Sequence, residues 1–210
     1  MLEDGASSYA QGGMPPYVWR TPFESRTGGG YLQWAMLTVE GLHWLADMDD
    51  RAFAGGRVGL QGHPAISVDI AHARWATASA ISAIDLCGAE LAVKYLGLGY
   101  PPSPDQTPTL AQLDANRLPS QAQLWVAGVK ADPQYGRTKR ARNGLIHRLL
   151  VRTAWISPTP GPPAPREAFA TDQPDIPDHR LSAGELVVVA RDMATAHVEE
   201  FHEASLQGRF

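Results

Sequence analysis

Residues 64–98, PAISVDIAHARWATASAISAIDLCGAELAVKYLGL, decide the fold. One row of mostly apolar side chains recurs at steps of three and four residues, the spacing of one helix face; it comprises Ile66, Ile70, Ala73, Thr77, Ile81, Ile84, Leu91 and Tyr95. A second apolar row falls on nearly the opposite side; it comprises Val68, Trp75, Leu86 and Val93. A helix that is apolar on two sides is buried on two sides. The segment therefore predicts a helix that lies centrally in a bundle or shares one face with a second subunit.

Helical patterns also occur before and after this segment. Residues 31–48 carry apolar side chains at helical spacing, although the run LQWAMLTV within them is also consistent with a strand. A short helix is expected near Leu110 and Leu113. Ser120-x-x-Gln123 and Ser182-x-x-Glu185 have the form of capping boxes, which place helix starts at these two serines. The first of these helices carries Leu124, Trp125 and Val129, and the second runs to about Leu206.

The rest of the chain defines the domain organisation. A helix is expected from about Pro133 to Ile156. Residues 157–179, SPTPGPPAPREAFATDQPDIPDH, are too rich in proline for a helix and too polar to pack as a strand, so they predict an exposed loop. Residues 1–60 form an N-terminal extension that is partly irregular, and residues 61–210 form the helical domain. The predicted fold is all-α, an up-and-down helical bundle.

Composition narrows the class of protein. The 210 residues are 44% hydrophobic and include one cysteine, Cys87, which allows neither an intrachain disulfide nor a cysteine zinc cluster. No apolar run approaches the roughly 20 residues that a membrane helix needs, and the N-terminus lacks the pattern of a secretory signal. We therefore expect a cytoplasmic protein without a membrane partner. The net charge is −4, yet residues 130–152 hold seven cations and one anion. Such a basic stretch is typical of a solvated helix face or of an anion-binding surface.

The sequence RARNGLIHRLL, within this basic stretch, brings together three groups that suit RNA cleavage. On a helix, Asn143 and His147 lie four residues apart on one face, and Arg142 lies about 140° from His147. An imidazole transfers protons near neutral pH, and a guanidinium stabilises charge that develops on phosphate oxygens. A carboxamide orients either group. The alternative interpretation is an ordinary polar helix surface.

The same segment resembles the signature helix of the HEPN superfamily (higher eukaryotes and prokaryotes nucleotide-binding domains), in which arginine and a polar residue precede a histidine after a short spacer. The similarity extends over about residues 64–206. It implies an up-and-down bundle, usually dimeric, in which two motifs face each other across a cleft, and a metal-independent ribonuclease activity. Arg142, Asn143 and His147 would then be catalytic. Glu90 and Lys94 match part of a further motif of some relatives, but Leu98 replaces its last carboxylate, so they receive no catalytic role.

These observations lead to two functional hypotheses. The first is a homodimeric endoribonuclease, a toxin or defence effector with an antitoxin as a candidate partner, which needs no metal or other cofactor and attacks through the substrate's 2′-hydroxyl. Its cationic RNA-binding residues would be Lys139, Arg140, Arg148 and Arg152. The second is a non-catalytic nucleotide- or RNA-binding or scaffolding module that uses the same helix.

Other polar and aromatic residues are assigned structural roles. His197 lies on the apolar face of the last helix and is expected to be a hydrogen-bonded core histidine, and its orientation relative to His202 is poor for joint metal ligation. Asp85 and Arg74 share a polar stripe but are too far apart along the helix to touch. The six tryptophans are interpreted as core residues.

Overall fold

The computed structural model describes residues 30–54, 68–97, 109–147, 153–154, 168–169 and 183–210. Within these ranges the helices are α2 (Gly30–Ala54), α3 (Val68–Leu96), the 3₁₀ helix η4 (Ala115–Arg117), α4 (Ser120–Ala131), α5 (Pro133–His147) and α6 (Ala183–Leu206). Two strands of two residues each, β1 (Thr153–Ala154) and β2 (Ala168–Phe169), pair in antiparallel fashion. Apart from short turns, the rest of the described chain is helical, which confirms the all-α class.

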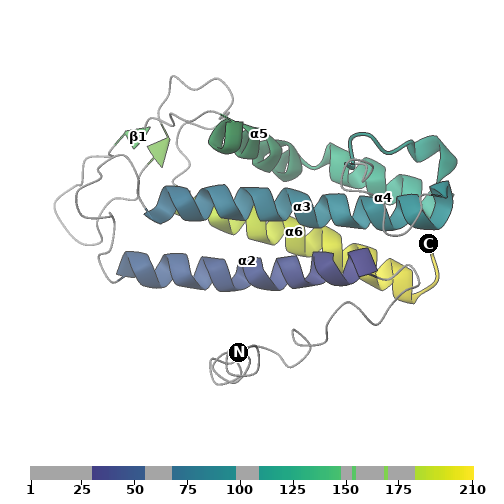
Figure 1. Cartoon of the computed structure of the whole chain (residues 1–210), viewed down its shortest axis with the longest axis horizontal. Helices are drawn as coiled ribbons and strands as arrows, with labels where there is room; N and C mark the ends of the chain where they lie inside the picture. Colours follow the sequence, from purple (N-terminus) through teal and green to yellow (C-terminus); the bar gives the residue numbers. More distant parts are fainter. Residues whose placement is uncertain (1–29, 55–67, 98–108, 148–152, 155–167, 170–182) are drawn as a thin grey trace.

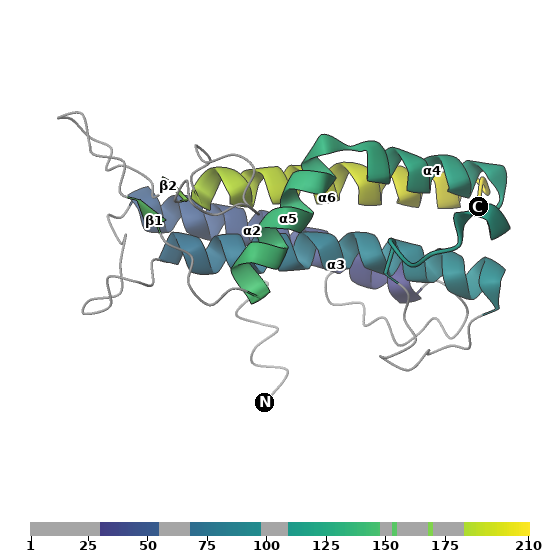
Figure 2. The same ribbon diagram turned by 90° about the horizontal axis from the view of Figure 1, so that it is seen from above.

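The bundle consists of three long helices and two shorter, consecutive helices that together occupy the fourth position. Helices α2, α3 and α6 lie side by side, with α2 running opposite to α3 and α6 (Figure 1). Helices α4 and α5 follow one another in the direction opposite to α3, and α5 crosses over α6 towards α3 (Figure 2). The chain thus goes up and down in the order α2, α3, α4–α5 and α6.

Helix α3 is central, as its two apolar rows predict. Its buried surface consists mostly of small side chains, which let neighbouring backbones approach closely; those with no exposed surface are Ala73, Ala76, Ala80, Ala83, Ala89 and Ala92. By composition alone, residues 70–96 are long and apolar enough to cross a membrane, but 61% of the most apolar window is buried inside the protein. This burial is typical of the core helix of a bundle. The second row is only partly covered, because Trp75 is 57% exposed.

Helix α2 belongs to the bundle core. It is a helix rather than a strand, and it is longer than the predicted 31–48. A buried hydrogen bond of 2.7 Å joins Asp49 Oδ1 to His72 Nδ1 of α3. At the other end of α2, the carboxyl group of Glu90 accepts hydrogen bonds from the backbone N–H groups of Tyr31 and Leu32. The boundary expected at residue 60 therefore does not separate α2 from the core, since both ends of α2 are fixed to α3.

Several predicted boundaries change in the structure. Helix α4 starts at Ser120 with Pro119 in the capping position and no side-chain cap, so the first capping box is wrong; Gln123 Nε2 instead donates to the carbonyl of Leu118 at 2.8 Å. Ser182 lies outside the described residues. The helix expected over 133–156 is wrong at its end, because β1 occupies 153–154 and pairs with 168–169 inside the proline-rich segment. Two residues of that segment therefore do form a strand.

Candidate functional site

The motif helix α5 begins at a corner that is fixed to α6. Asp132 Oδ1 accepts a hydrogen bond from the backbone N–H of Gln134 at 2.8 Å, which caps the start of α5. The second carboxylate oxygen lies 2.8 Å from His197 Nε2 of α6. His197 is thus the hydrogen-bonded, largely buried histidine that the sequence predicts. One aspartate both starts the motif helix and holds its first turn against α6.

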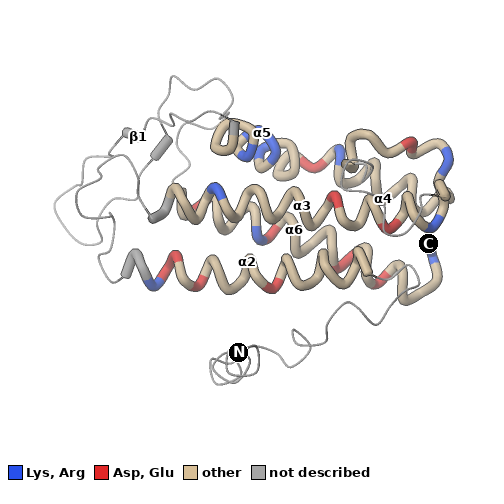
Figure 3. Tube along the Cα trace, in the orientation of Figure 1, with Lys and Arg blue, Asp and Glu red and all other residues tan. Residues whose placement is uncertain are grey.

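Helix α5 has a buried side and a basic side. Tyr135, Thr138, Ala141 and Leu145 are buried against the bundle. All charged residues of α5 are cations, and they lie outside this buried side. Helix α5 is therefore the densest cluster of positive charge in the described ranges (Figure 3). Its helix dipole adds a partial negative charge near the C-terminal end. The side chains there must supply the positive potential themselves.

Arg142 lies on the edge between these two sides. Its Nη1 donates to Asn143 Oδ1 at 3.1 Å, so the carboxamide fixes one end of the guanidinium. Its Nε is buried and has no hydrogen-bond partner among the residues that the structure describes. Asn143 is exposed and Arg142 is half-buried. The structure therefore brings Arg142 and Asn143 together as a pair, with the guanidinium partly unsatisfied.

Asp85 of α3 lies within electrostatic range of this edge of α5. Its Oδ1 accepts a hydrogen bond from the backbone N–H of Leu110 at 2.8 Å. Burial raises the pKa of Asp85, and the charges of Lys139 and Arg142 oppose the rise. Tyr135 lies nearby, and burial together with the Asp85 charge raises its pKa to about 12. Lys139 Nζ lies 5.7 Å from the Tyr135 ring centroid, a cation–π distance.

The remaining predicted site residues are only partly placed. Lys139 is on the same flank as Arg142, and Arg140 is exposed on the outward side. His147 is the last residue of α5, and its side chain lies outside the described residues, as do Arg148 and Arg152. Helix geometry alone sets His147 about 7.5 Å further along the axis than Arg142 and about 140° around it.

No family model, curated protein or solved structure matches this chain. The likeness to the HEPN superfamily thus depends on the residues of the motif and on the helical order around it.

The sequence did not reveal that Asp85 and Tyr135 accompany the motif. Asp85 stands out as a carboxylate in an apolar helix, but nothing in the sequence indicates which element it faces. Arg74, its companion in the polar stripe, is exposed, and the described hydrogen bond of Asp85 goes to Leu110 instead. The expectation that these two residues do not touch is consistent with this arrangement.

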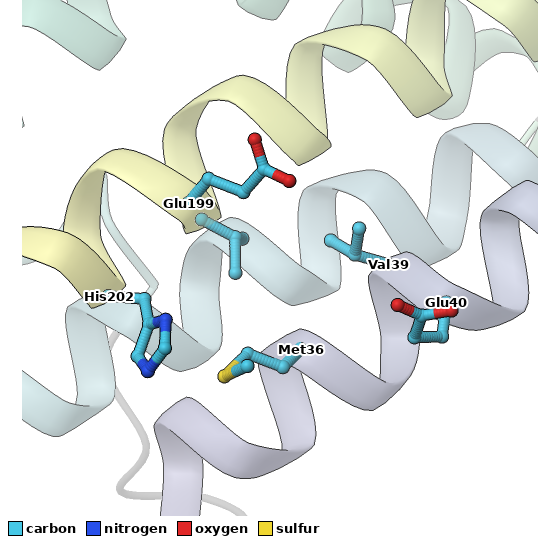
Figure 4. A pocket seen from close by; sticks show the side chains of 6 residues that line it. Met36, Val39, Glu40, Glu199 and His202 are labelled. Carbon is cyan, nitrogen blue, oxygen red and sulfur yellow. The ribbon is translucent and has the colours of Figure 1, made fainter. Parts of the chain in front are cut away.

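Polar groups also gather at a hollow outside α5. A hollow of about 70 Å³ lies between α2 and α6, with Glu40, Glu199 and His202 at its polar edge and Met36, Val39 and Val198 completing its lining (Figure 4). Among the described residues no three histidine, cysteine, aspartate or glutamate side chains are grouped to hold a metal ion. The hollow is too small for a nucleotide, whose sites usually occupy about 300 Å³ or more.

The core assignment of the tryptophans is wrong for three of them. Trp34, Trp44 and Trp75 are 48%, 46% and 57% exposed. Trp125 is 3% exposed, and its Nε1 donates to the carbonyl of His197 at 3.1 Å. Trp19 and Trp155 lie outside the described residues. Helical spacing identifies a helix face but does not say whether a neighbour covers that face.

Proposed function

We propose that the protein is a metal-independent endoribonuclease of HEPN type, which cleaves RNA through attack of the substrate's own 2′-hydroxyl. The observation that carries the proposal is the guanidinium of Arg142, held by Asn143 at 3.1 Å on the basic helix that ends in His147. A half-buried guanidinium in low-dielectric surroundings binds a phosphate oxygen more strongly than a fully solvated one. The resemblance of the motif to the superfamily supports the same assignment.

Each side chain then has a distinct role. Arg142 stabilises the negative charge that grows on the non-bridging phosphate oxygens as the 2′-oxygen attacks. Asn143 keeps the guanidinium in place, and His147 transfers a proton. Lys139, Arg140, Arg148 and Arg152 attract the flanking phosphates, so affinity should fall as salt concentration rises. Two copies of the chain would place two motifs across one cleft, which makes a homodimer part of the proposal.

A second candidate is a non-catalytic nucleotide- or RNA-binding or scaffolding module. It is favoured by Asp85, which lies within electrostatic range of Lys139 and Arg142 and weakens the positive potential of that edge when it is ionised. A toxin or defence role, a cytoplasmic location and an antitoxin partner belong to the first candidate. The toxin role would appear as growth arrest when the chain is expressed, and the antitoxin partner would appear as rescue by a neighbouring gene product.

The test is cleavage of structured and single-stranded RNA by purified protein. Arg142→Lys keeps the charge but loses the planar fork, so cleavage should fall strongly; Arg117→Lys, an exposed arginine of η4, is the matched control. His147→Ala should lower the rate by about 10²–10⁴-fold, whereas His202→Ala should not. Products should end in a 2′,3′-cyclic phosphate, and activity should persist in chelator. If folded Arg142→Lys cleaves RNA as fast as wild type does, Arg142 has no role in the reaction.

A further inference from the structure

An uncharged, aromatic face lies on the side of the α2–α3 pair that is turned away from α6. It carries Trp34, Trp44 and Trp75, which are 48%, 46% and 57% exposed. Exposed apolar area that gathers on one face marks an interaction surface, whereas single exposed apolar residues are ordinary. We propose that this tryptophan face is the surface through which two copies of the chain associate, about a two-fold axis at Gly41. The inference rests on the homodimer of the proposed function and names its surface, and its test does not depend on RNA cleavage.

The α2 part of the tryptophan face is a row at steps of three and four residues, the spacing of a helix–helix seam; it comprises Trp34, Leu37, Gly41, Trp44 and Met48. By helix geometry the row is centred about 100° from Asp49, the residue that contacts α3. His43, whose Nε2 is 3.0 Å from Thr195 Oγ1 of α6, lies about 120° from Asp49 in the opposite direction. The row therefore lies on the side of α2 that is turned away from α6.

The α3 part of the face is the middle of the second apolar row of that helix. Trp75 lies about 60° from His72, the residue that contacts α2, and the two rings are 6.0 Å apart. The buried Ala73 and Ala80 lie about 80–100° from His72 in the opposite direction, towards the core. Trp75 thus borders the contact between α2 and α3 on the same side as the α2 row. Figure 1 views this side, with α6 behind both helices.

Gly41 is the residue of this face that its own fold does not explain. It lies in the interior of a helix of 25 residues, where glycine is less favourable than alanine. A Cβ built at Gly41 would meet no atom of the described residues within 4 Å. No contact in the described part of the chain therefore requires the missing side chain. A second helix could approach closely at this position, because glycine has no side chain to hold it away.

Large and small residues are spaced around Gly41 as in a self-complementary surface. Asp49 lies beside His72, and α2 and α3 run in opposite directions. Gly41 is therefore level with the small side chains of Ser79 and Ser82 on α3. Small residues thus occupy the centre of the face on both helices. The tryptophans and the other large residues lie on either side of this centre.

On α2 these distances match the pairing of a two-fold contact. In such a contact, a residue before the axis meets the residue that lies equally far after it in the other copy. An axis through Gly41, perpendicular to α2 and within the contact plane, would pair Trp34 with Met48 of the partner copy. It would pair Trp44 with Leu37 of the partner copy. Each ring would meet an aliphatic or thioether side chain, and the two glycines would meet at the axis.

The same axis suits α3 and α5. It passes level with Ser79 and Ser82, so it would pair Trp75 with Leu86 of the partner copy. Leu86 is partly buried and packs against the core, which gives the ring a firm surface. Helix α5 crosses over α6 towards α3 (Figure 2). An axis within the contact plane leaves both α5 helices at one edge of the dimer, the arrangement that a cleft with two motifs requires.

The size and the charge of the face favour a second copy as its occupant. A half-exposed tryptophan leaves roughly 100 Å² for a partner. The six rings of a dimer amount to roughly 600 Å², more than a third of the about 1,600 Å² that a specific interface buries. No residue of either row is charged, and charged residues are depleted at the centres of interfaces. A nucleic acid or an acidic protein would instead require cations, which the two rows lack.

The first test is sedimentation of the full chain over a series of concentrations. Gly41→Ala should raise the dissociation constant of the dimer about tenfold or more, because two added methyl groups overpack the contact at the axis. Alanine is the better helix former, so this loss cannot come from an unfolded α2. Gly128→Ala is the matched control, since Gly128 is also a helical glycine with open space around it but lies on α4. It should leave the dimer unchanged.

Trp34→Ala should raise the dissociation constant about 30-fold or more, as truncation of an interface anchor does. Leu124→Ala, at a residue of α4 that is 65% exposed, should not. A dimer that Gly41→Ala and Trp34→Ala leave intact would overturn the tryptophan face but not the homodimer of the proposed function. A monomeric wild type would also overturn it and leave the face to residues 1–29 of the same chain or to another molecule. The expected losses in a protein that cleaves no RNA would overturn the proposed function alone.

A covalent test does not depend on weakened association. In Gly41→Cys the two thiols would face each other across the axis, where closely packed helices bring Cα atoms within the about 4.4–6.8 Å that a disulfide spans. Mild oxidation with copper phenanthroline should therefore give a covalent dimer of Gly41→Cys but not of Gly128→Cys. Cys87 is fully buried in both variants and should stay reduced. Equal cross-linking of the two variants, or none in either, would exclude the axis at Gly41.

Discussion

The pair of Asp49 and His72 offers a direct measure of how firmly α2 is held in the bundle. The two side chains are 2% and 7% exposed, and Asp49 Oδ1 lies 2.7 Å from His72 Nδ1. Asp49→Ala leaves the imidazole buried without its partner. The cost is about 1–3 kcal/mol if the imidazole is neutral and about 3–5 kcal/mol if the pair is ionic. For a chain of this size each kcal/mol lowers the melting temperature by about 2–4 °C.

Urea unfolding of four proteins tests this value. Asp49→Ala, His72→Ala and the double variant form a cycle with wild type, and the coupling free energy should be about 1–3 kcal/mol. Asp47→Ala is the control, because Asp47 lies two residues away but is exposed, and its ion pair with Arg51 spans 3.9 Å on the surface. That pair should contribute at most about 1 kcal/mol. If Asp49→Ala destabilises the protein no more than Asp47→Ala does, α2 is not packed against α3 and belongs to an extension after all.

Three further predictions concern assembly, burial and charge. Sedimentation at micromolar concentration should give about twice the 22.7 kDa chain mass, and a persistent monomer would remove the two-motif cleft from the proposal. Cys87 is fully buried and burial raises the pKa of its thiol, so alkylation should be slow in native buffer and rapid in denaturant; fast native labelling would contradict the packing of α3. Burial also raises the pKa of Glu90, so the folded state loses stability as pH rises above the unfolded value of about 4.3. Glu90→Gln lacks that loss, and its unfolding free energy relative to wild type should increase from about pH 4 to neutral pH, whereas a constant difference would show that Glu90 is not desolvated.

The elements that could be predicted from sequence are those with a long, regular apolar pattern. The first row of α3 is buried from Ala73 to Leu91, as its spacing requires, and partly buried at Ile70 and Tyr95. Helix α6 is buried along one face through Leu186, Ala190 and Phe201. The membership of α2 in the core was missed, because it depends on Asp49 meeting His72 across a gap of 23 residues. The exposure of Trp75 was missed for a related reason. A periodic pattern specifies which side chains share a face, and only tertiary packing decides what covers it.

The candidate site also has one part that the sequence predicts and one part that only the fold reveals. Arg142 and Asn143 are adjacent in the chain, so their contact could be inferred from the motif itself. Asp85 lies more than fifty residues before Arg142, and its approach to α5 depends on the angle at which α5 crosses α3 (Figure 2). That angle is set partly by Asp132 and His197, which join the start of α5 to α6. No local signal in the sequence encodes this crossing.

The position of α3 in the bundle also has a consequence for synthesis of the chain on the ribosome. Helix α3 ends at Leu96, but α6, which covers another side of it, is complete only at Leu206. At about 5–20 residues per second, translation of the intervening chain takes on the order of 5–20 s. During that time α2, and later α5, can cover only other sides of a segment whose hydropathy matches that of a membrane helix. We therefore expect nascent chains that end between α3 and α6 to be bound by chaperones or by the targeting machinery, and to be released once α6 has emerged.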